Sequence, residues 1–132
     1  LNYRKNFLKK IISRLKKNGS RVSLFIEPQI KDIYIAKKLS ADCIEFHTGK
    51  ICNLINKHKS YKSEFIKINK AASLAAELGL EVHAGHGLTY QSAKIISKIK
   101  KIKELNIGHF LIGESIYIGL PSVIKQFKKI IN

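Results

Sequence analysis

The spacing of apolar residues along the chain predicts amphipathic helices separated by shorter apolar segments. In the helical segments, apolar residues recur at intervals of three and four, as they do on one face of a helix. Helices are expected over 3–17, 29–39, 60–78, from 88 onward and over 121–131. Thr89 and Ser92 are the two candidate caps for the fourth of these helices. A polar loop is expected between 49 and 60.

Four short apolar stretches, bounded by glycine, proline or other turn residues, are typical of buried strands. They cover 21–27, 42–49, 80–87 and 104–109. Strands that alternate with helices predict right-handed crossovers and a parallel sheet, so the expected fold class is α/β. No linker divides the chain, which predicts a single domain over 1–132. Four such units fit either a small doubly wound sheet or half of an eight-stranded barrel.

Composition points to a globular chain without a membrane span. Of the 132 residues, 45% are hydrophobic, and no apolar stretch approaches the ~18 residues that a membrane span needs. The first ten residues are charged throughout and lack the apolar core of a signal peptide. Cys43 and Cys52 form no CxxC pattern, so we expect reduced thiols and a cytoplasmic setting.

The net charge of +16, from 25 Lys and Arg against 9 Asp and Glu, is the strongest bias in the composition. A basic surface favours phosphate-rich partners such as nucleic acid. Here, however, nearly all the charge is lysine spread along helical segments, without the arginines or interleaved aromatics of specific readers. We therefore expect no specific nucleic-acid partner. A noncatalytic basic α/β module that binds RNA or other phosphates through its lysines is kept as the alternative.

Ionisable residues and glycines stand at the ends of all four predicted strands. In parallel α/β folds, ligands bind beyond these carboxyl ends. Histidine takes and gives a proton near neutrality, and glycine lets a phosphate approach the backbone N–H groups. This combination suits proton transfer on an anionic substrate. The residues are Glu27, then Glu45 and His47, then His83, His86 and Gly87, and finally Gly108 and His109.

Each of these residues also has a simpler interpretation. Glu45 and His47 are two apart on one strand face, where they could form a solvated or hydrogen-bonded pair. His83 and His86 are three apart, which sends strand side chains to opposite faces. No third ligand follows at a familiar zinc spacing, so no metal site is expected. His58 lies in a lysine-rich loop and is expected on the surface.

Several motifs, taken in order, resemble the pyridoxine 5′-phosphate synthase family. They are "RVSLFIEP", "ADCIEFHTG", "INKAASLAAELGLEV", "AGHGLTY" and "ELNIGHFLIGESIYIGL", and the similarity covers essentially the whole chain. The family fold is a (β/α)8 TIM barrel with extra helices. The resemblance therefore implies that the four strands are strands five to eight, and that 1–132 is the carboxyl-terminal half of a barrel whose amino-terminal half is absent from this chain.

The resemblance also implies an activity and roles for five residues. The family condenses 1-deoxy-D-xylulose 5-phosphate with 3-amino-2-oxopropyl phosphate to pyridoxine 5′-phosphate, phosphate and water, without a metal or organic cofactor. His86 matches the proton donor and Glu45 a carboxylate that stabilises the transition state. Gly87, Gly108 and His109 match contacts to the amino-ketone phosphate. Another phosphate-binding barrel or doubly wound enzyme is the competing enzymatic interpretation.

Two departures from the family pattern matter. Where the family usually has Asn, this chain has His83, an additional imidazole near the expected site. The first half of the barrel, with the family's other acid–base residues and most contacts to the deoxyxylulose phosphate, is also missing. A half barrel leaves two sheet edges and apolar surface unpaired, which predicts self-association. We expect activity to require the other half, and homo-oligomers in the full-length form.

Overall fold

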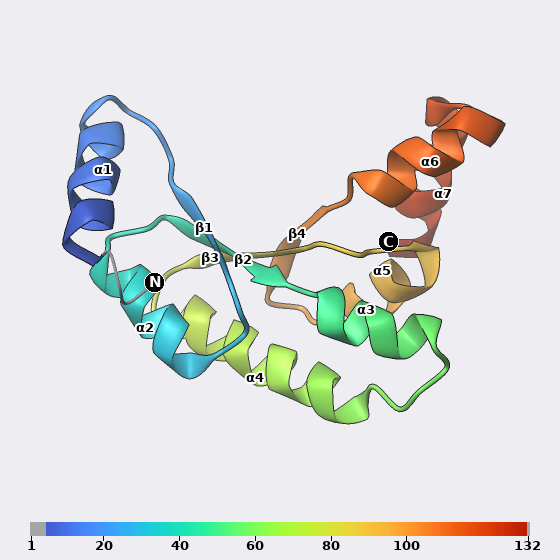
Figure 1. Ribbon diagram of the computed structural model, residues 1–132, viewed down its shortest axis with the longest axis horizontal. Helices are drawn as coiled ribbons and strands as arrows, with labels where there is room; N and C mark the ends of the chain where they lie inside the picture. Colours follow the sequence, from blue (N-terminus) through green and yellow to red (C-terminus); the bar gives the residue numbers. More distant parts are fainter. Residues whose placement is uncertain (1–4, 132) are drawn as a thin grey trace.

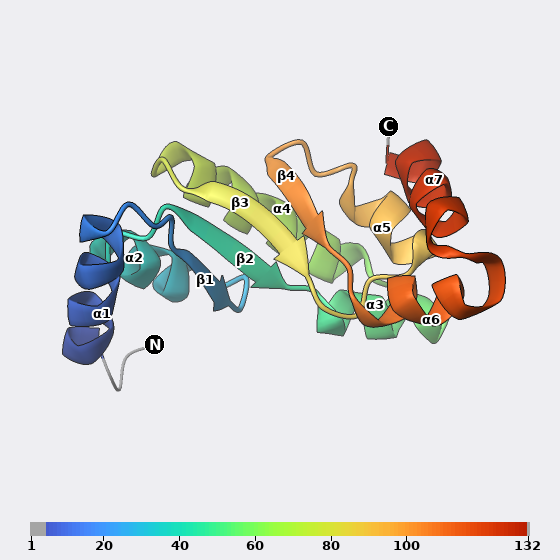
Figure 2. The ribbon, with the colours of Figure 1, turned by 90° about the horizontal axis from the view of Figure 1, so that it is seen from above.

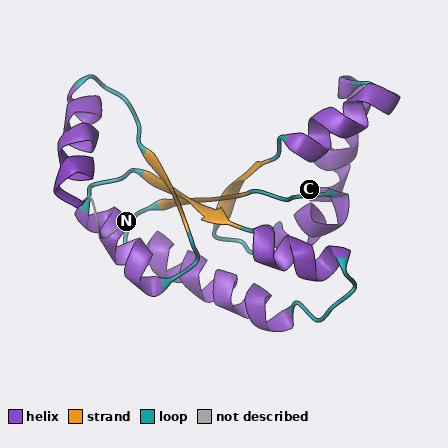
Figure 3. Ribbon diagram, viewed as in Figure 1, coloured by secondary structure: helices purple, strands orange, loops and turns teal. Residues whose placement is uncertain are grey.

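The computed structural model describes residues 5–131, in which helices and short strands alternate (Figure 1, Figure 3). The elements are α1 (Lys5–Lys17), β1 (Ser23–Ile26), α2 (Ile30–Lys38), β2 (Cys43–His47), α3 (Gly49–Asn56), α4 (Lys62–Glu77), β3 (Glu81–Gly85), α5 (Tyr90–Ile96), β4 (Ile102–Asn106), α6 (His109–Ile118) and α7 (Leu120–Ile131). The predicted helix over 3–17 is confirmed from residue 5, and its first two residues lie outside the described range.

The strands form one parallel sheet in the order β1-β2-β3-β4, so each strand pairs with its neighbour along the chain. Their arrows run toward the edge where α3 and α6 begin (Figure 2). Within residues 5–131, β1 and β4 each pair with a single strand, which leaves the sheet open at both edges. The predicted α/β class is confirmed, and an open parallel sheet is what part of a (β/α)8 barrel would provide.

The two sides of the sheet differ in polarity because successive strand residues point to opposite sides. The side packed against α2, α3, α4 and α5 holds the main hydrophobic core, which includes Ile44, Phe46, Val82 and Ala84. The register pairs Cys43 with Glu81 and Glu45 with His83, so these polar side chains share the opposite side. That polar side is the one that would face the interior of a closed barrel.

Two helices lie where the hydrophobic pattern predicts none. α3 occupies part of the predicted polar loop and buries Ile51, Cys52 and Ile55 along one face. The apolar residues of α6 are spread around the helix among His109, Glu114 and Ser115, so it has no helical period to detect. Both helices begin at the carboxyl ends of strands, where they shape the candidate site.

The predicted strand over 104–109 was wrong at both ends. β4 covers Ile102–Asn106, and its register against β3 shifts between Val82 and His83. Gly108 instead precedes α6, and His109 is the first residue of that helix. The other three strands fall within their predicted ranges.

Two further expectations are met by the described residues. Between residues 5 and 131, no helix is both long enough and apolar enough to span a membrane. Cys43 and Cys52 are buried free thiols. Burial raises the pKa of both thiols above the ordinary value, and for Cys43 it outweighs the opposing effect of the Arg21 guanidinium.

Candidate active site

Four of the ionisable residues predicted at the strand ends lie along one edge of the sheet, because all four strands run in the same direction. Glu45 and His83 are instead the middle residues of β2 and β3. Glu27 follows β1, His47 ends β2, His86 follows β3, and His109 follows β4 after a two-residue gap. This edge is also where α3 and α6 begin (Figure 2).

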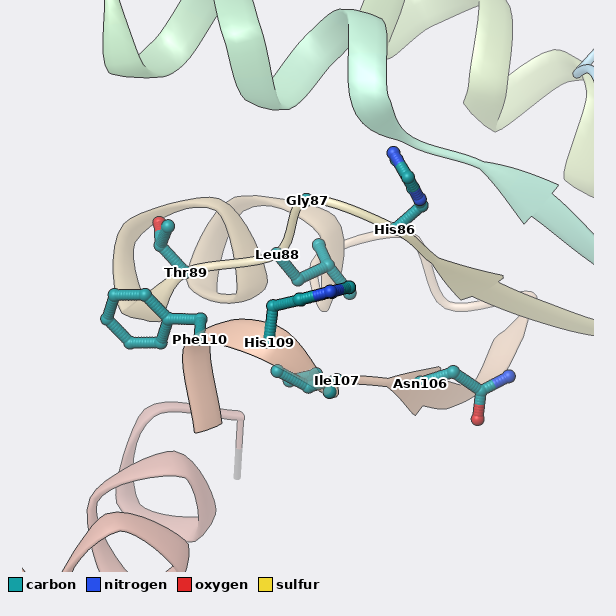
Figure 4. Close-up of a pocket in the computed structure, with 9 residues that line it drawn as sticks. His86, Gly87, Leu88, Thr89, Asn106, Ile107, His109 and Phe110 are labelled. Atoms are coloured by element: carbon teal, nitrogen blue, oxygen red, sulfur yellow. The ribbon is translucent and has the colours of Figure 1, made fainter. Parts of the chain in front are cut away.

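A pocket of about 470 Å³ lies between the loop that follows β3 and the loop that follows β4 (Figure 4). Four of the five predicted site residues line it together. Its lining consists of His86, Gly87, Leu88, Thr89, Asn106, Ile107, Gly108, His109 and Phe110. The glycines leave the backbone of both loops open to a ligand, and the first N–H groups of α6 have no partner within the helix.

Glu45 reaches the same region through Asn106, which sequence reasoning missed. Glu45 is half-buried on the polar side of β2, and Asn106 Nδ2 donates a hydrogen bond of 2.7 Å to its Oε2 atom. Asn106 in turn lines the pocket. The strand between them carries Gly85, where a Cβ atom would overlap Glu45 Oε1. Gly85 is therefore the residue that leaves room for the carboxylate.

His86 is exposed and has a backbone φ of +77°, a left-handed conformation that is uncommon for residues other than glycine. Its ring lies 4.6 Å from the ring of His47, measured between centroids, with a tilt of 55°. In Figure 4 the ring points away from His109 and toward the start of α3. The two predicted histidines thus line one pocket without facing each other.

Thr48 holds the backbone beneath His86 and is a second residue that sequence reasoning missed. Its side chain is fully buried, and its Oγ1 atom lies 2.7 Å from the Gly85 carbonyl oxygen and 2.9 Å from that of His86. The Thr48 N–H also donates to the Gly85 carbonyl, at 2.9 Å. These bonds fix the end of β3 against the end of β2. The signal in the sequence is the "HTG" motif, in which Thr48 stands between His47 and Gly49.

A second hollow of about 460 Å³ lies on the other side of His86 and is rich in lysine. It is lined by His47, Gly49, Lys50, Asn53, Leu54, Lys57, Lys59 and His86. His47 Nδ1 is 2.7 Å from Glu27 Oε1, so His47 pairs with the end of β1 and not with Glu45. A Cβ atom at Gly49 would lie 2.8 Å from His47 Nε2, so any larger residue at position 49 would crowd the imidazole. His86 therefore borders two hollows.

Aromatic packing holds the two pocket loops together. The rings of Tyr90 and Phe110 are 5.0 Å apart and nearly perpendicular, and Phe127 of α7 lies 4.6 Å from Tyr90. Thr89 caps α5 through a reciprocal arrangement with Ser92, so both predicted capping residues take part. α5, α6 and α7 are thereby joined directly behind the pocket.

His83 and His58 do not line the pocket. His83 is buried on the polar side of β3, with Nε2 2.8 Å from Glu81 Oε1. His58 is exposed, as predicted. His83 thus lies in the middle of β3, as the register partner of Glu45, and not at the strand end where it was expected.

Comparison with known protein families matches residues 1–132 to the family described as Pyridoxal phosphate biosynthesis protein PdxJ. The chain belongs to this family. Among curated proteins, it is 57% identical over 128 residues to the pyridoxine 5′-phosphate synthase of Pelagibacter ubique (strain HTCC1062), covering 97% of this chain and 54% of that protein.

Other PdxJ relatives give the same coverage. The pyridoxine 5′-phosphate synthase of Zymomonas mobilis is 50% identical over 125 residues, which are 95% of this chain and 48% of the relative. The corresponding protein of Sulfurihydrogenibium sp. is 45% identical over 126 residues, 96% of this chain and 51% of the relative. The chain therefore spans about half the length of the curated PdxJ relatives it matches.

Proposed function

We propose that this chain forms the carboxyl-terminal half of a pyridoxine 5′-phosphate synthase, with strands five to eight of its barrel. In this proposal it binds 3-amino-2-oxopropyl phosphate and supplies the proton donor for its condensation with 1-deoxy-D-xylulose 5-phosphate. The observation that carries the proposal is the single pocket that gathers His86, Gly87, Gly108 and His109 in a member of the PdxJ family.

The phosphate of the amino ketone is assigned to the two pocket loops. Gly87 and Gly108 expose the backbone there, and the amino end of α6 offers unpaired N–H groups and a partial positive charge. His109, the first residue of α6, is exposed beside them and adds a further donor. Loops after the last two strands commonly bind phosphate in TIM barrels.

His86 is assigned the role of proton donor. The reaction adds an amine to a carbonyl, expels water and phosphate and closes a ring, and each step moves a proton. His86 is exposed and borders both the pocket and the lysine-rich hollow, so its ring can serve atoms bound on either side. General acid catalysis by one such group contributes about 10²- to 10⁴-fold to the rate.

Glu45 is assigned the stabilisation of positive charge on the nitrogen as the imine forms. Its carboxylate is kept in one position by Asn106, next to the pocket. A fixed negative group of this kind requires no reorganisation when the charge develops. The remaining acid–base groups and most contacts to the deoxyxylulose phosphate are assigned to the other half of the barrel, which would pair with the open edges of β1 and β4.

The test is a hybrid protein in which this chain replaces the matching 54% of the Pelagibacter ubique relative. We expect the hybrid to form pyridoxine 5′-phosphate. His86→Ala should abolish turnover and leave binding of inorganic phosphate nearly unchanged, whereas His58→Asn, at an exposed loop position, should alter neither. A folded hybrid that binds no phosphorylated ketone would contradict the proposal.

The alternative of a noncatalytic basic module has one observation in its favour. α1 lines a hollow with Lys9, Lys10, Arg14 and Lys17, far along the chain from the pocket. If RNA binding were the function, affinity would fall with the logarithm of salt concentration, and His86→Ala would be silent. Replacing two of these α1 cations with Gln would then abolish the function and spare the pocket.

A further inference from the structure

A second cluster of chemically active side chains lies on the polar side of the sheet, at the beginning of β2 and β3. Cys43 and Glu81 are the first residues of these strands and are register partners. His83 follows Glu81 by two residues and therefore points to the same side. One ligand atom from each of the three lies within 4.8 Å of the others.

The three side chains are of the types that bind zinc: a thiolate sulfur, an imidazole nitrogen and a carboxylate oxygen. Cys43 is 3% exposed and His83 is 7% exposed, so the two ligands that zinc prefers are shielded from solvent. All three are carried by adjacent hydrogen-bonded strands, which hold ligands more rigidly than loops do.

A neighbouring carboxylate faces the other nitrogen of the imidazole. His83 Nε2 is 2.8 Å from Glu81 Oε1, while His83 Nδ1 is 3.6 Å from Glu104 Oε1 of β4. Metal-binding histidines almost always direct their second nitrogen at a carboxylate, a carbonyl or water, which orients the ring. Glu104 stands where such a partner is needed.

Arg21 occupies the cluster in this structure. Its Nη2 atom is 2.9 Å from Cys43 Sγ and 3.1 Å from Glu81 Oε2. The Arg21 side chain is 63% exposed, so its guanidinium can leave toward solvent without burying a charge. A cation bound by the same sulfur and carboxylate would take the place of this guanidinium.

We propose that Cys43, Glu81 and His83 bind a divalent transition metal, with zinc the best match to the ligand set. None of the three residues lines the proposed substrate pocket, although His83, in the middle of β3, is the register partner of Glu45. Three protein ligands leave a fourth tetrahedral position for water. The metal would clamp β2 to β3 at the start of the sheet, and its binding free energy would add to the stability of the folded chain.

The local sequence pairs His83 only with His86, three residues along the same segment, and therefore predicts no metal site. The parallel register brings in Cys43, 40 positions before His83 in the chain, and this pairing has no signature in local spacing.

The experiment titrates Zn²⁺ into the full 132-residue chain, under a non-thiol reductant, against a chromophoric chelator. The hybrid protein is titrated in parallel, so that folding of the isolated chain does not limit the test. We expect one zinc per chain, and with Co²⁺ a thiolate-to-metal charge-transfer band. Cys43→Ser and His83→Asn should each weaken binding by more than the roughly tenfold loss expected for Glu104→Gln.

Three controls make the assignment specific. Cys52→Ser removes the other buried thiol and His58→Asn an exposed imidazole, and both should leave zinc affinity unchanged. Arg21→Gln removes the competing guanidinium and should tighten binding, a gain that misfolding cannot produce. Zinc binding that survives Cys43→Ser but is lost in His86→Asn would place the metal at His47 and His86 and overturn the proposal, as would absence of stoichiometric binding.

Discussion

Asn106 Nδ2 and Glu45 Oε2 are joined by a 2.7 Å hydrogen bond that spans from β4 to β2, across the strand between them. The bond forms over Gly85, which pairs with Asn106 in the sheet register and has no side chain to fill the space. One carboxylate, one glycine and one amide on three consecutive strands therefore fix the position of the negative charge at the candidate site.

Asn106→Ala should lower turnover of the hybrid protein more than it lowers stability. The half-buried Glu45 carboxylate loses its fixed partner and becomes mobile, and misplacement by about 1 Å can cost roughly 100-fold in rate. We expect a fall in kcat of about 10- to 100-fold with KM nearly unchanged. Steady-state kinetics check this, and unchanged kcat in the variant would show that the hydrogen bond has no catalytic part.

Gly85→Ala should also displace the Glu45 carboxylate, in this case by steric overlap. The added methyl group overlaps Glu45 Oε1, so the side chain must move and its bond to Asn106 is lost. We expect a destabilisation of about 1–3 kcal/mol together with reduced kcat. Urea unfolding measures the destabilisation, and steady-state kinetics measure kcat.

Gly113→Ala is the matched control for this change. Gly113 lies inside α6 with open space around its Cβ position, so alanine should be neutral or stabilising by up to about 1 kcal/mol. Equal destabilisation of the two alanine variants would contradict the proposed crowding at Gly85.

Sequence patterns predicted most of the residues that gather at the edge of the sheet, although His83 was expected there and lies in the middle of β3. Parallel strands end on one side, so the positions of Glu27, His47, His86 and His109 followed from the alternation of strands and helices. The hydrogen-bond partners of the site residues could not be predicted in this way. Asn106 meets Glu45 across 61 positions of sequence, through a register that no local pattern encodes.

α4 was predicted because it buries a single face, and α6 was missed because it does not. α4 has a regular buried stripe that includes Ile68, Ala72 and Ala75, and its period is visible in the sequence. In α6, Ile112, Ile116 and Tyr117 are all exposed, and no residue of this helix is buried, so no buried face marks it in the sequence. Such a surface is what a half barrel leaves when the elements that would cover it belong to the other half.

Thr48→Val should destabilise the fold and loosen the His86 loop. The valine keeps the volume but removes the hydroxyl. The Gly85 carbonyl still accepts from the residue 48 N–H, whereas the His86 carbonyl is left with only the weak Cys52 thiol donor at 3.7 Å. A buried unsatisfied acceptor costs about 1–3 kcal/mol. Thr48→Ser retains the hydroxyl and should recover most of this loss in urea unfolding. If the valine variant were as stable as the serine variant, these bonds would not hold the loop in solution.

His86 should be replaceable by glycine at lower cost in stability than by alanine. The residue has a φ of +77°, which glycine adopts freely and alanine only at a cost of about 1 kcal/mol. Both variants lack the imidazole and should be inactive in the hybrid. The gap between their unfolding midpoints checks the backbone conformation, and identical midpoints would mean that the left-handed turn is absent in solution.

Asp42 should contribute to the acid sensitivity of the fold. The Lys16 ammonium at 2.7 Å and the Val22 N–H at 2.9 Å stabilise its charge and hold its pKa below the ordinary value. Because the folded-state pKa is depressed, this stabilisation is complete above the unfolded pKa of about 4 and is lost as the pH falls through the folded pKa.

Asp42→Asn should therefore lower stability near neutral pH and flatten the decline of the unfolding free energy below about pH 5. Glu77→Gln, at an exposed position on α4, is the control. A variant curve parallel to that of the unaltered chain throughout the acid range would rule out this role for Asp42.

The most direct test of the central claim is a titration of the isotope-labelled hybrid with inorganic phosphate, followed by its amide resonances. We expect saturable shifts at Gly87, Gly108 and His109, and these should persist in the His86→Ala variant because that ring is assigned to proton transfer. Shifts confined to the lysine-rich α1, with none at the two pocket loops, would contradict the assignment of this pocket to a phosphorylated substrate.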